Sequence, residues 1–98
     1  MNHVEMLRRR GRIVATIRSF FETREYLAAE TPPLAARPIP EAHIELFETV
    51  YHPPDYRHEA PTPLFLLPSP EYYLKRLLAA GSGNVYELTH SFRNVESL

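Results

Sequence analysis

Two short strings in the second half of the chain contain residue types that could do chemistry. They are Ser69-Pro70-Glu71 and Arg93-Asn94. A carboxylate at a helix start can hold an ammonium group, and the rigid fork of an arginine makes bidentate, charge-assisted hydrogen bonds to a phosphate. Each string alone has an ordinary explanation, as a capped helix or as a surface ion pair. Their order and spacing along one chain favour a functional interpretation.

Two other groups of polar residues are weaker candidates. His52, Asp55 and His58 offer three metal-ligating side chains, but they lie in a proline-rich stretch without helical spacing, and the chain has no cysteine. We therefore expect no metal site there. The arginines at positions 8 to 10 and 12 could bind nucleic acid. Because the net charge of the chain is only -1, a solvated helix face is the better interpretation.

The composition limits the kind of protein. With 98 residues, 44% of them hydrophobic, the chain can form one small domain with a core. The absence of cysteine excludes disulfides and thiolate chemistry and is compatible with a reducing compartment. The longest aliphatic or aromatic run, residues 64–67, is far too short to span a membrane. We therefore expect a cytoplasmic protein with no membrane partner.

The N-terminal third should supply a helix and a short strand that precede these strings. Apolar residues with helical spacing predict a helix over about 4–24, and Gly11 could kink it or delay its start. The two phenylalanines of this stripe are expected in the core; its members are Ile13, Ile17, Phe20 and Phe21. A strand over residues 26–31 follows and ends at Pro32, because proline cannot donate a ladder hydrogen bond.

The rest of the chain should form three more strands and a second helix. Strands are expected over residues 43–51, 63–68 and 85–90, with a proline-rich loop over 52–63. Ser69 is a good N-cap and Pro70 a good first helical residue, while Glu71 stands where the helix dipole favours an anion. The glycines of residues 81–83 end the helix with a left-handed backbone. Its apolar stripe, expected in the core, consists of Leu74, Leu77 and Leu78.

Three segments of the sequence resemble the class II lysyl-tRNA synthetases. Residues 18–21 and 26–32 are similar to motif 1, which we place at about 13–32, and residues 85–96 resemble the start of motif 2. Residues 69–78 resemble the amino-acid-binding segment, and the leucine-rich run that completes it is similar to that of the elongation factor P lysine ligases. The resemblance implies an α+β fold, in which residues 1–98 form part of the catalytic domain: a fragment of the class II antiparallel sheet with flanking helices.

The resemblance also implies a reaction and assigns residues to it. Members of the family activate lysine or β-lysine with ATP and transfer it to elongation factor P or, in the synthetases, to tRNA. Arg93 would be the catalytic arginine that holds the α-phosphate. Asn94 and Glu96 would join it in binding the nucleotide, and the amino acid would be bound by Ser69, Pro70 and Glu71. ATP is the implied cofactor, accompanied by Mg²⁺ in the complete enzyme.

Three positions depart from the family pattern. Val95 stands where the family has a glutamate that helps to fix the adenine end of the nucleotide. Glu96 comes one residue later, and a shift of one residue turns a side chain to the opposite face of a strand. Pro68 replaces a threonine before Ser69, which removes a hydroxyl and a backbone donor. Ala29 replaces a valine, a change that should thin the packing.

Three interpretations stay open, because we expect the second strand of motif 2 and all of motif 3 to be missing from this sequence. The first is a truncated or degenerate ATP-dependent lysine or β-lysine ligase, whose activity as an enzyme is uncertain. The second is a non-catalytic interaction module, in which the motif 1 segment from Ile13 to Pro32 pairs with itself in a homodimer or with an intact paralogue. The third is a fragment of a lysyl-tRNA synthetase, which differs from the first only in its acceptor.

Overall fold

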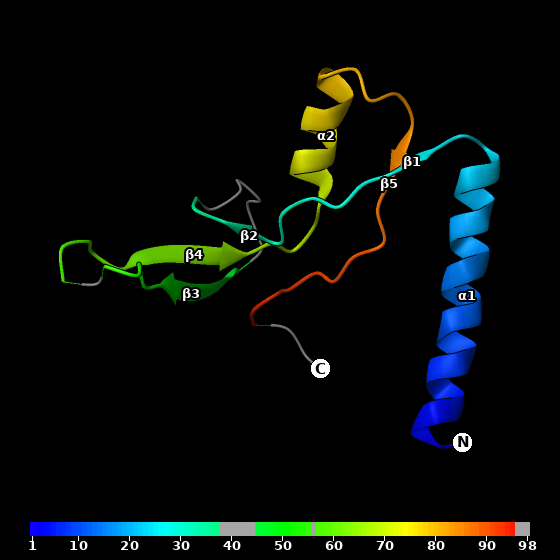
Figure 1. Cartoon of the computed structure of the whole chain (residues 1–98), viewed down its shortest axis with the longest axis horizontal. Coiled ribbons are helices and arrows are strands. Elements are labelled where there is room, and N and C mark those ends of the chain that lie inside the picture. Colours follow the sequence, from blue (N-terminus) through cyan, green and yellow to red (C-terminus); the bar gives the residue numbers. More distant parts are fainter. Residues whose placement is uncertain (38–44, 56, 96–98) are drawn as a thin grey trace.

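The computed structural model of the chain describes residues 1–37, 45–55 and 57–95. It contains two helices and five strands in the described part, so the expected α+β class is confirmed (Figure 1). In chain order the elements are α1 (His3–Thr23), β1 (Leu27–Ala28), β2 (Leu34–Ala35), β3 (Phe47–Tyr51), β4 (Thr62–Leu66), α2 (Glu71–Ala79) and β5 (Val85–Tyr86).

Helix α1 begins and ends with side-chain and backbone caps. The side-chain oxygen of Asn2 accepts a hydrogen bond from the Glu5 N–H at 2.9 Å, which satisfies one of the four unpaired donors at a helix start. The helix continues through Gly11, so this glycine does not delay its start. At the other end the Tyr26 N–H donates to the Phe21 carbonyl at 3.0 Å, which turns the chain into β1.

The larger sheet has three antiparallel strands in the order β2-β4-β3. Strand β4 lies in the middle and pairs over its full length with β3. The expected strand over 63–68 is therefore confirmed within two residues at each end. The strand expected over 43–51 begins later, at Phe47, although Glu45 forms an isolated antiparallel bridge with Asn94. Residues 43 and 44 lie outside the described residues.

The smaller sheet joins β1 and β5 in parallel. The Leu27 N–H donates to the Asn84 carbonyl at 2.9 Å, and the Ala29 N–H donates to the Tyr86 carbonyl at 2.8 Å. The strands predicted over 26–31 and 85–90 are thus wrong in length, because each forms a strand of only two residues. The physical reason is that the next donor along β1, the Thr31 N–H, bonds a side-chain carboxylate instead of a backbone carbonyl.

Helix α2 begins one residue later than predicted. Pro70 occupies the N-cap position, and its carbonyl accepts the first helical hydrogen bond, from the Leu74 N–H. The Ser69 hydroxyl nevertheless accepts from the Glu71 N–H at 3.1 Å, so the predicted contact of this serine with the first turn is present. The predicted left-handed ending is confirmed, since Gly81 has φ 93°.

The buried core of the described chain is small. Its buried hydrophobic residues are Ala35, Leu67 and Tyr86, exposed by 7%, 3% and 6%. Phe21 stacks on Tyr86 with ring centroids 4.5 Å apart, which fixes the end of α1 against the small sheet. The molecule as a whole is open: its radius of gyration is 17.3 Å, against about 13 Å for a compact domain of this length.

Two expectations about burial are wrong for this reason. Helix α1 has no buried residue, and Phe20 is 48% exposed. On α2, Leu77 and Leu78 are also exposed. Figure 1 shows α1 running away from both sheets towards the N-terminus, and β1 is the described element that it contacts most. An apolar stripe predicts which face of a helix will be buried, but here the described chain supplies little to cover it.

Candidate functional site

Leu67 brings the two predicted strings together. Its N–H donates to the Pro33 carbonyl at 3.0 Å, and its carbonyl accepts from the Phe92 N–H at 3.1 Å. Ser69 follows Leu67 by two residues, and Arg93 follows Phe92 directly. Leu67 is the most buried of the core residues. The chain that leads into α2 and the segment that contains Arg93 therefore both extend from the same part of the core.

The residues predicted to bind an amino acid divide between two environments. Ser69 and Pro70 are half-buried and line a very small cavity of about 10 Å³, which is roughly the room that one water molecule needs. Glu71 is exposed on α2 and does not line this cavity. Its carboxylate accepts from the Lys75 ammonium at 2.7 Å, one turn along the helix. The hydrogen bond from Lys75 and then its positive charge hold the pKa of Glu71 below its ordinary value.

Two of the residues predicted to bind the nucleotide, Arg93 and Asn94, are exposed. The Asn94 N–H donates to the Glu45 carbonyl at 3.0 Å, which fixes this segment beside the chain that leads into β3. Arg93 is exposed between the two anchored residues Phe92 and Asn94. Phe92 is thus bonded to the core residue Leu67 and Asn94 to the exposed residue Glu45, so hydrogen bonds fix the backbone on both sides of the exposed arginine.

The end of this segment has a strained backbone. Val95 has φ 56°, and a β-branched residue rarely adopts this left-handed conformation. The Asn94 side-chain oxygen accepts from the Val95 N–H at 2.9 Å, so the amide of Asn94 supports this turn. Glu96, the remaining predicted nucleotide contact, lies outside the described residues.

Sequence reasoning missed the carboxylate of Glu87. This half-buried side chain accepts hydrogen bonds from both the N–H and the hydroxyl of Thr31, the latter at 2.9 Å. It lines the same small cavity as Ser69 and Pro70, together with His90. The sequence did contain a signal for this contact. Glu87 shares one face of the predicted strand with the apolar Val85, and a charged side chain on an apolar face needs a partner.

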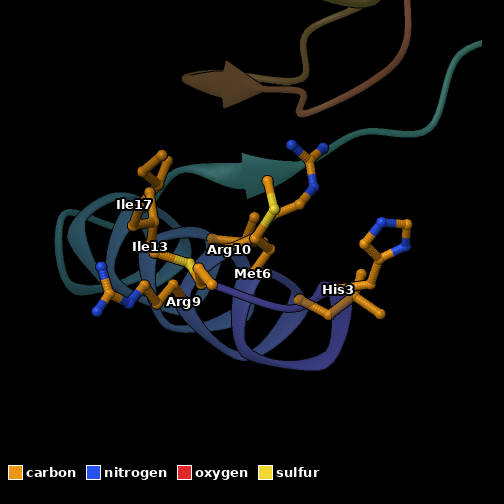
Figure 2. A pocket seen from close by; sticks show the side chains of 9 residues that line it. His3, Met6, Arg9, Arg10, Ile13 and Ile17 are labelled. Carbon is orange, nitrogen blue, oxygen red and sulfur yellow. The ribbon is translucent and has the colours of Figure 1, made fainter.

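The structure offers one further surface, on α1. Figure 2 shows Met6, Ile13 and Ile17 along one side of this helix, with Arg9 and Arg10 beside them. Ile13 is 62% exposed, so this apolar face is open to solvent in the described chain. We refer to it as the α1 face, lined mainly by Met6, Leu7, Ile13, Val14 and Ile17.

Neither a metal cluster nor a membrane helix occurs in the described part of the chain. Residues 1–37, 45–55 and 57–95 contain no group of three or more His, Cys, Asp or Glu side chains that could hold a metal ion. Neither α1 nor α2 is long and apolar enough to cross a membrane.

Comparison with known proteins agrees with the resemblance seen in the sequence. A family model described as tRNA synthetases class II (D, K and N) matches residues 2–97. Curated relatives include proteins named elongation factor P–(R)-β-lysine ligase from three bacteria. The sequence is 38% identical to that of Vibrio parahaemolyticus and 44% to that of Pasteurella multocida, over 94 residues each. It is 43% identical over 93 residues to that of Buchnera aphidicola.

These matches cover 95–96% of this chain but only 28% of each relative. The chain therefore spans less than a third of the length of the relatives it matches, in their amino-terminal part.

Proposed function

The chain belongs to the class II tRNA synthetases of the D, K and N group, and we propose that it forms part of the activation site of an ATP-dependent ligase for lysine or β-lysine. The names of the relatives support this substrate class. The observation that carries the proposal is the hydrogen bond from the Phe92 N–H to the Leu67 carbonyl, which joins the Arg93 segment to the segment that leads into Ser69.

The proposed reaction joins the carboxylate of the amino acid to the α-phosphate of ATP. A carboxylate oxygen forms a bond to phosphorus while the bond from phosphorus to the β-phosphate oxygen breaks, and pyrophosphate leaves with that electron pair. Positioning and charge stabilisation provide most of the rate in such transfers. Arg93 would neutralise the α-phosphate oxygens, and Asn94 would lie beside the nucleotide, both on a backbone that the hydrogen bonds of Phe92 and Asn94 hold in place.

The amino acid would be held at the start of α2. The Ser69 hydroxyl already meets the first turn of this helix, and the Glu71 carboxylate already holds an ammonium, that of Lys75. A substrate ammonium would replace Lys75 at Glu71. The ion pair is exposed to water, where such pairs contribute little to stability, so this exchange of partners is energetically accessible.

Mg²⁺ accompanies ATP in reactions of this class, where it neutralises phosphate charge. The described residues contain no cluster of ligating side chains for a metal ion. The proposed reaction therefore assigns no metal to the described residues, and any Mg²⁺ would be bound chiefly by the phosphates of the nucleotide.

Equilibrium binding of ATP tests the proposal. Because the chain covers 28% of its relatives, the assay should use a chimera in which residues 1–98 replace the matching part of the Pasteurella multocida relative. Arg93→Ala should raise the Kd for ATP by about 10- to 100-fold, the loss of a charge-assisted bidentate contact. Arg12→Ala removes the same charge from exposed α1 and is the matched control. Equal affinity for all three proteins would contradict the role of Arg93.

A second candidate function, a non-catalytic homodimer, is favoured by the open α1 face. A dimer would cover Ile13 and its apolar neighbours. Light scattering should then give twice the 11.4 kDa of one chain. Ile13→Glu should restore the monomer, whereas Ala15→Glu, on the opposite side of the helix, should not. A monomer with the native sequence would exclude this candidate.

The molecule that accepts the activated amino acid distinguishes a protein ligase from a lysyl-tRNA synthetase. Transfer of the activated amino acid from the chimera to elongation factor P would support the ligase, and transfer to tRNA would support a lysyl-tRNA synthetase. Both acceptors can be tested with the same radiolabelled amino acid.

A further inference from the structure

Glu87 links two segments that lie far apart in the sequence. Its two carboxylate oxygens accept from the N–H and from the hydroxyl of Thr31, a residue 56 positions away. Glu87 is half-buried, and a carboxylate removed from water is strongly held by donors that satisfy both oxygens. The contact is therefore a fixed connection between the end of motif 1 and the segment that leads from β5 to Arg93.

The contact of Glu87 with Thr31 takes the place of one backbone hydrogen bond between the parallel strands β1 and β5. The Leu27 and Ala29 N–H groups donate to the carbonyls of Asn84 and Tyr86. The next donor in this series is the Thr31 N–H, which bonds the Glu87 side chain instead of a backbone carbonyl. The two strands can thus separate after Tyr86 without leaving the N–H of the half-buried Thr31 unpaired.

Beyond this point the two segments are joined again through Leu67. The hydrogen bonds and the chain between them form a closed loop, which we call the circuit. From Thr31 the chain runs to Pro33, whose carbonyl accepts from the Leu67 N–H. The Leu67 carbonyl accepts from the Phe92 N–H, and the chain from Phe92 leads back to Glu87. The cavity beside Ser69 and Pro70 is lined by Thr31, Leu67 and Glu87 of this circuit. The other hydrogen bonds of the circuit join backbone groups to each other, so the contact between Glu87 and Thr31 is the one that depends on a side chain.

We infer that Glu87 is a positioning residue, which fixes the segment bearing Arg93 relative to the start of α2 at Ser69. This inference rests on the proposed function, because it assigns Glu87 to the geometry of the same activation site. Without the Glu87 carboxylate the chain between Tyr86 and Phe92 has lost its anchor to motif 1. The hydrogen bonds of Leu67 and Phe92 then open more often, and the two segments lose their fixed separation.

Conservative variants distinguish the hydrogen bonds from the charge. In Glu87→Gln the amide oxygen can accept from the Thr31 N–H, and the amide nitrogen can donate to the Thr31 hydroxyl. Thr31→Ser keeps both donors. Glu87→Ala removes both acceptors, and Thr31→Val removes only the hydroxyl. The expected order of disruption is therefore Glu87→Ala, then Thr31→Val, with Glu87→Gln and Thr31→Ser close to the parent.

Amide hydrogen exchange of the 98-residue chain, followed by NMR, tests the inference. In Glu87→Ala the Leu67 and Phe92 amides should exchange faster by on the order of tenfold, the effect of losing hydrogen bonds to a charged acceptor. The amide of Leu64, in the middle of the pairing between β3 and β4, serves as the internal reference and should change by less than about twofold. Glu87→Gln should restore the parent rates at Leu67 and Phe92.

Two results would overturn the inference. The first is unchanged exchange at Leu67 and Phe92 in Glu87→Ala. The second is an equal acceleration at Leu64, which would mean a general loss of stability rather than a loss of positioning. Neither result depends on catalysis, so failure of the proposed ligase activity and failure of this inference are observed in separate experiments.

Discussion

Replacement of Glu25 by glycine should stabilise the chain. At the end of α1 the Tyr26 N–H donates to the Phe21 carbonyl and the Glu25 N–H donates to the Glu22 carbonyl, both at 3.0 Å. This turn places Glu25 at φ 61°. A left-handed backbone costs an L-residue about 1–2 kcal/mol and costs glycine very little.

Part of this gain is offset in the unfolded chain. Glycine has more conformational freedom there, which costs about 0.5–1 kcal/mol on folding. The net stabilisation should therefore be about 0.5–1 kcal/mol. For a chain of this length each kcal/mol raises Tm by about 4–8 °C, so the expected increase is about 2–8 °C.

The end of α2 supplies the matched control. There the Ser82 N–H donates to the Leu77 carbonyl and the Gly81 N–H donates to the Leu78 carbonyl, again at 3.0 Å. A Cβ added at Gly81 would meet nothing within 4 Å, so Gly81→Ala tests the backbone conformation without a clash. It should destabilise the chain by about 1 kcal/mol.

Thermal unfolding followed by circular dichroism at 222 nm measures both variants against the parent chain. Glu25→Gly should raise Tm and Gly81→Ala should lower it. A Tm for Glu25→Gly at or below that of the parent would refute the assignment of strain to Glu25. The aromatic contact between Phe21 and Tyr26, with centroids 5.2 Å apart, does not involve the side chain at position 25 and should be retained.

Two further predictions concern the helices. Lys75→Ala should raise the pKa of Glu71 towards its ordinary value of 4.5, because the hydrogen bond and charge of Lys75 hold this pKa lower in the parent chain. The small stability that the pair contributes is present above pH 4.5 and is lost as the pH falls through the lowered pKa. An NMR titration of the Glu71 carboxyl that gives the same pKa in both proteins would contradict this cause. Gly11→Ala should stabilise α1 by about 0.5–1 kcal/mol, since an added Cβ meets nothing within 4 Å, and an unchanged thermal transition would count against it.

Local signals in the sequence predicted the helices well. The spacing of Ile13, Ile17 and Phe20 gave the extent of α1 to within one residue at each end, and Gly81 marked the end of α2. These features depend on neighbours within one or two turns, which a sequence displays directly.

Pairing and burial could not be predicted in the same way. The strand over 85–90 is reduced to two residues because Thr31, 56 positions from Glu87, bonds a carboxylate. Likewise, the stripe on α1 predicted a buried face, but it does not identify what covers that face. Both outcomes depend on contacts between distant segments, which periodicity does not reveal.

The candidate site, too, combines residues that the sequence identified with contacts that the structure alone reveals. The sequence identified the strings that contain Ser69 and Arg93 through their resemblance to a family. The structure adds their connection through Leu67 and the contact of Glu87, and it directs Glu71 towards Lys75. The left-handed backbone of Val95 was also beyond sequence reasoning, because valine is among the residues least suited to that conformation.

The most direct test of the central claim is the exchange of radiolabelled pyrophosphate into ATP by the chimera that contains residues 1–98. We expect exchange that requires lysine or β-lysine and that falls by at least about 100-fold in Arg93→Ala, because the α-phosphate loses its charge stabilisation. Arg12→Ala should exchange at the parent rate. Exchange that persists in Arg93→Ala, or that does not require the amino acid, would contradict the assignment of these residues to the activation site.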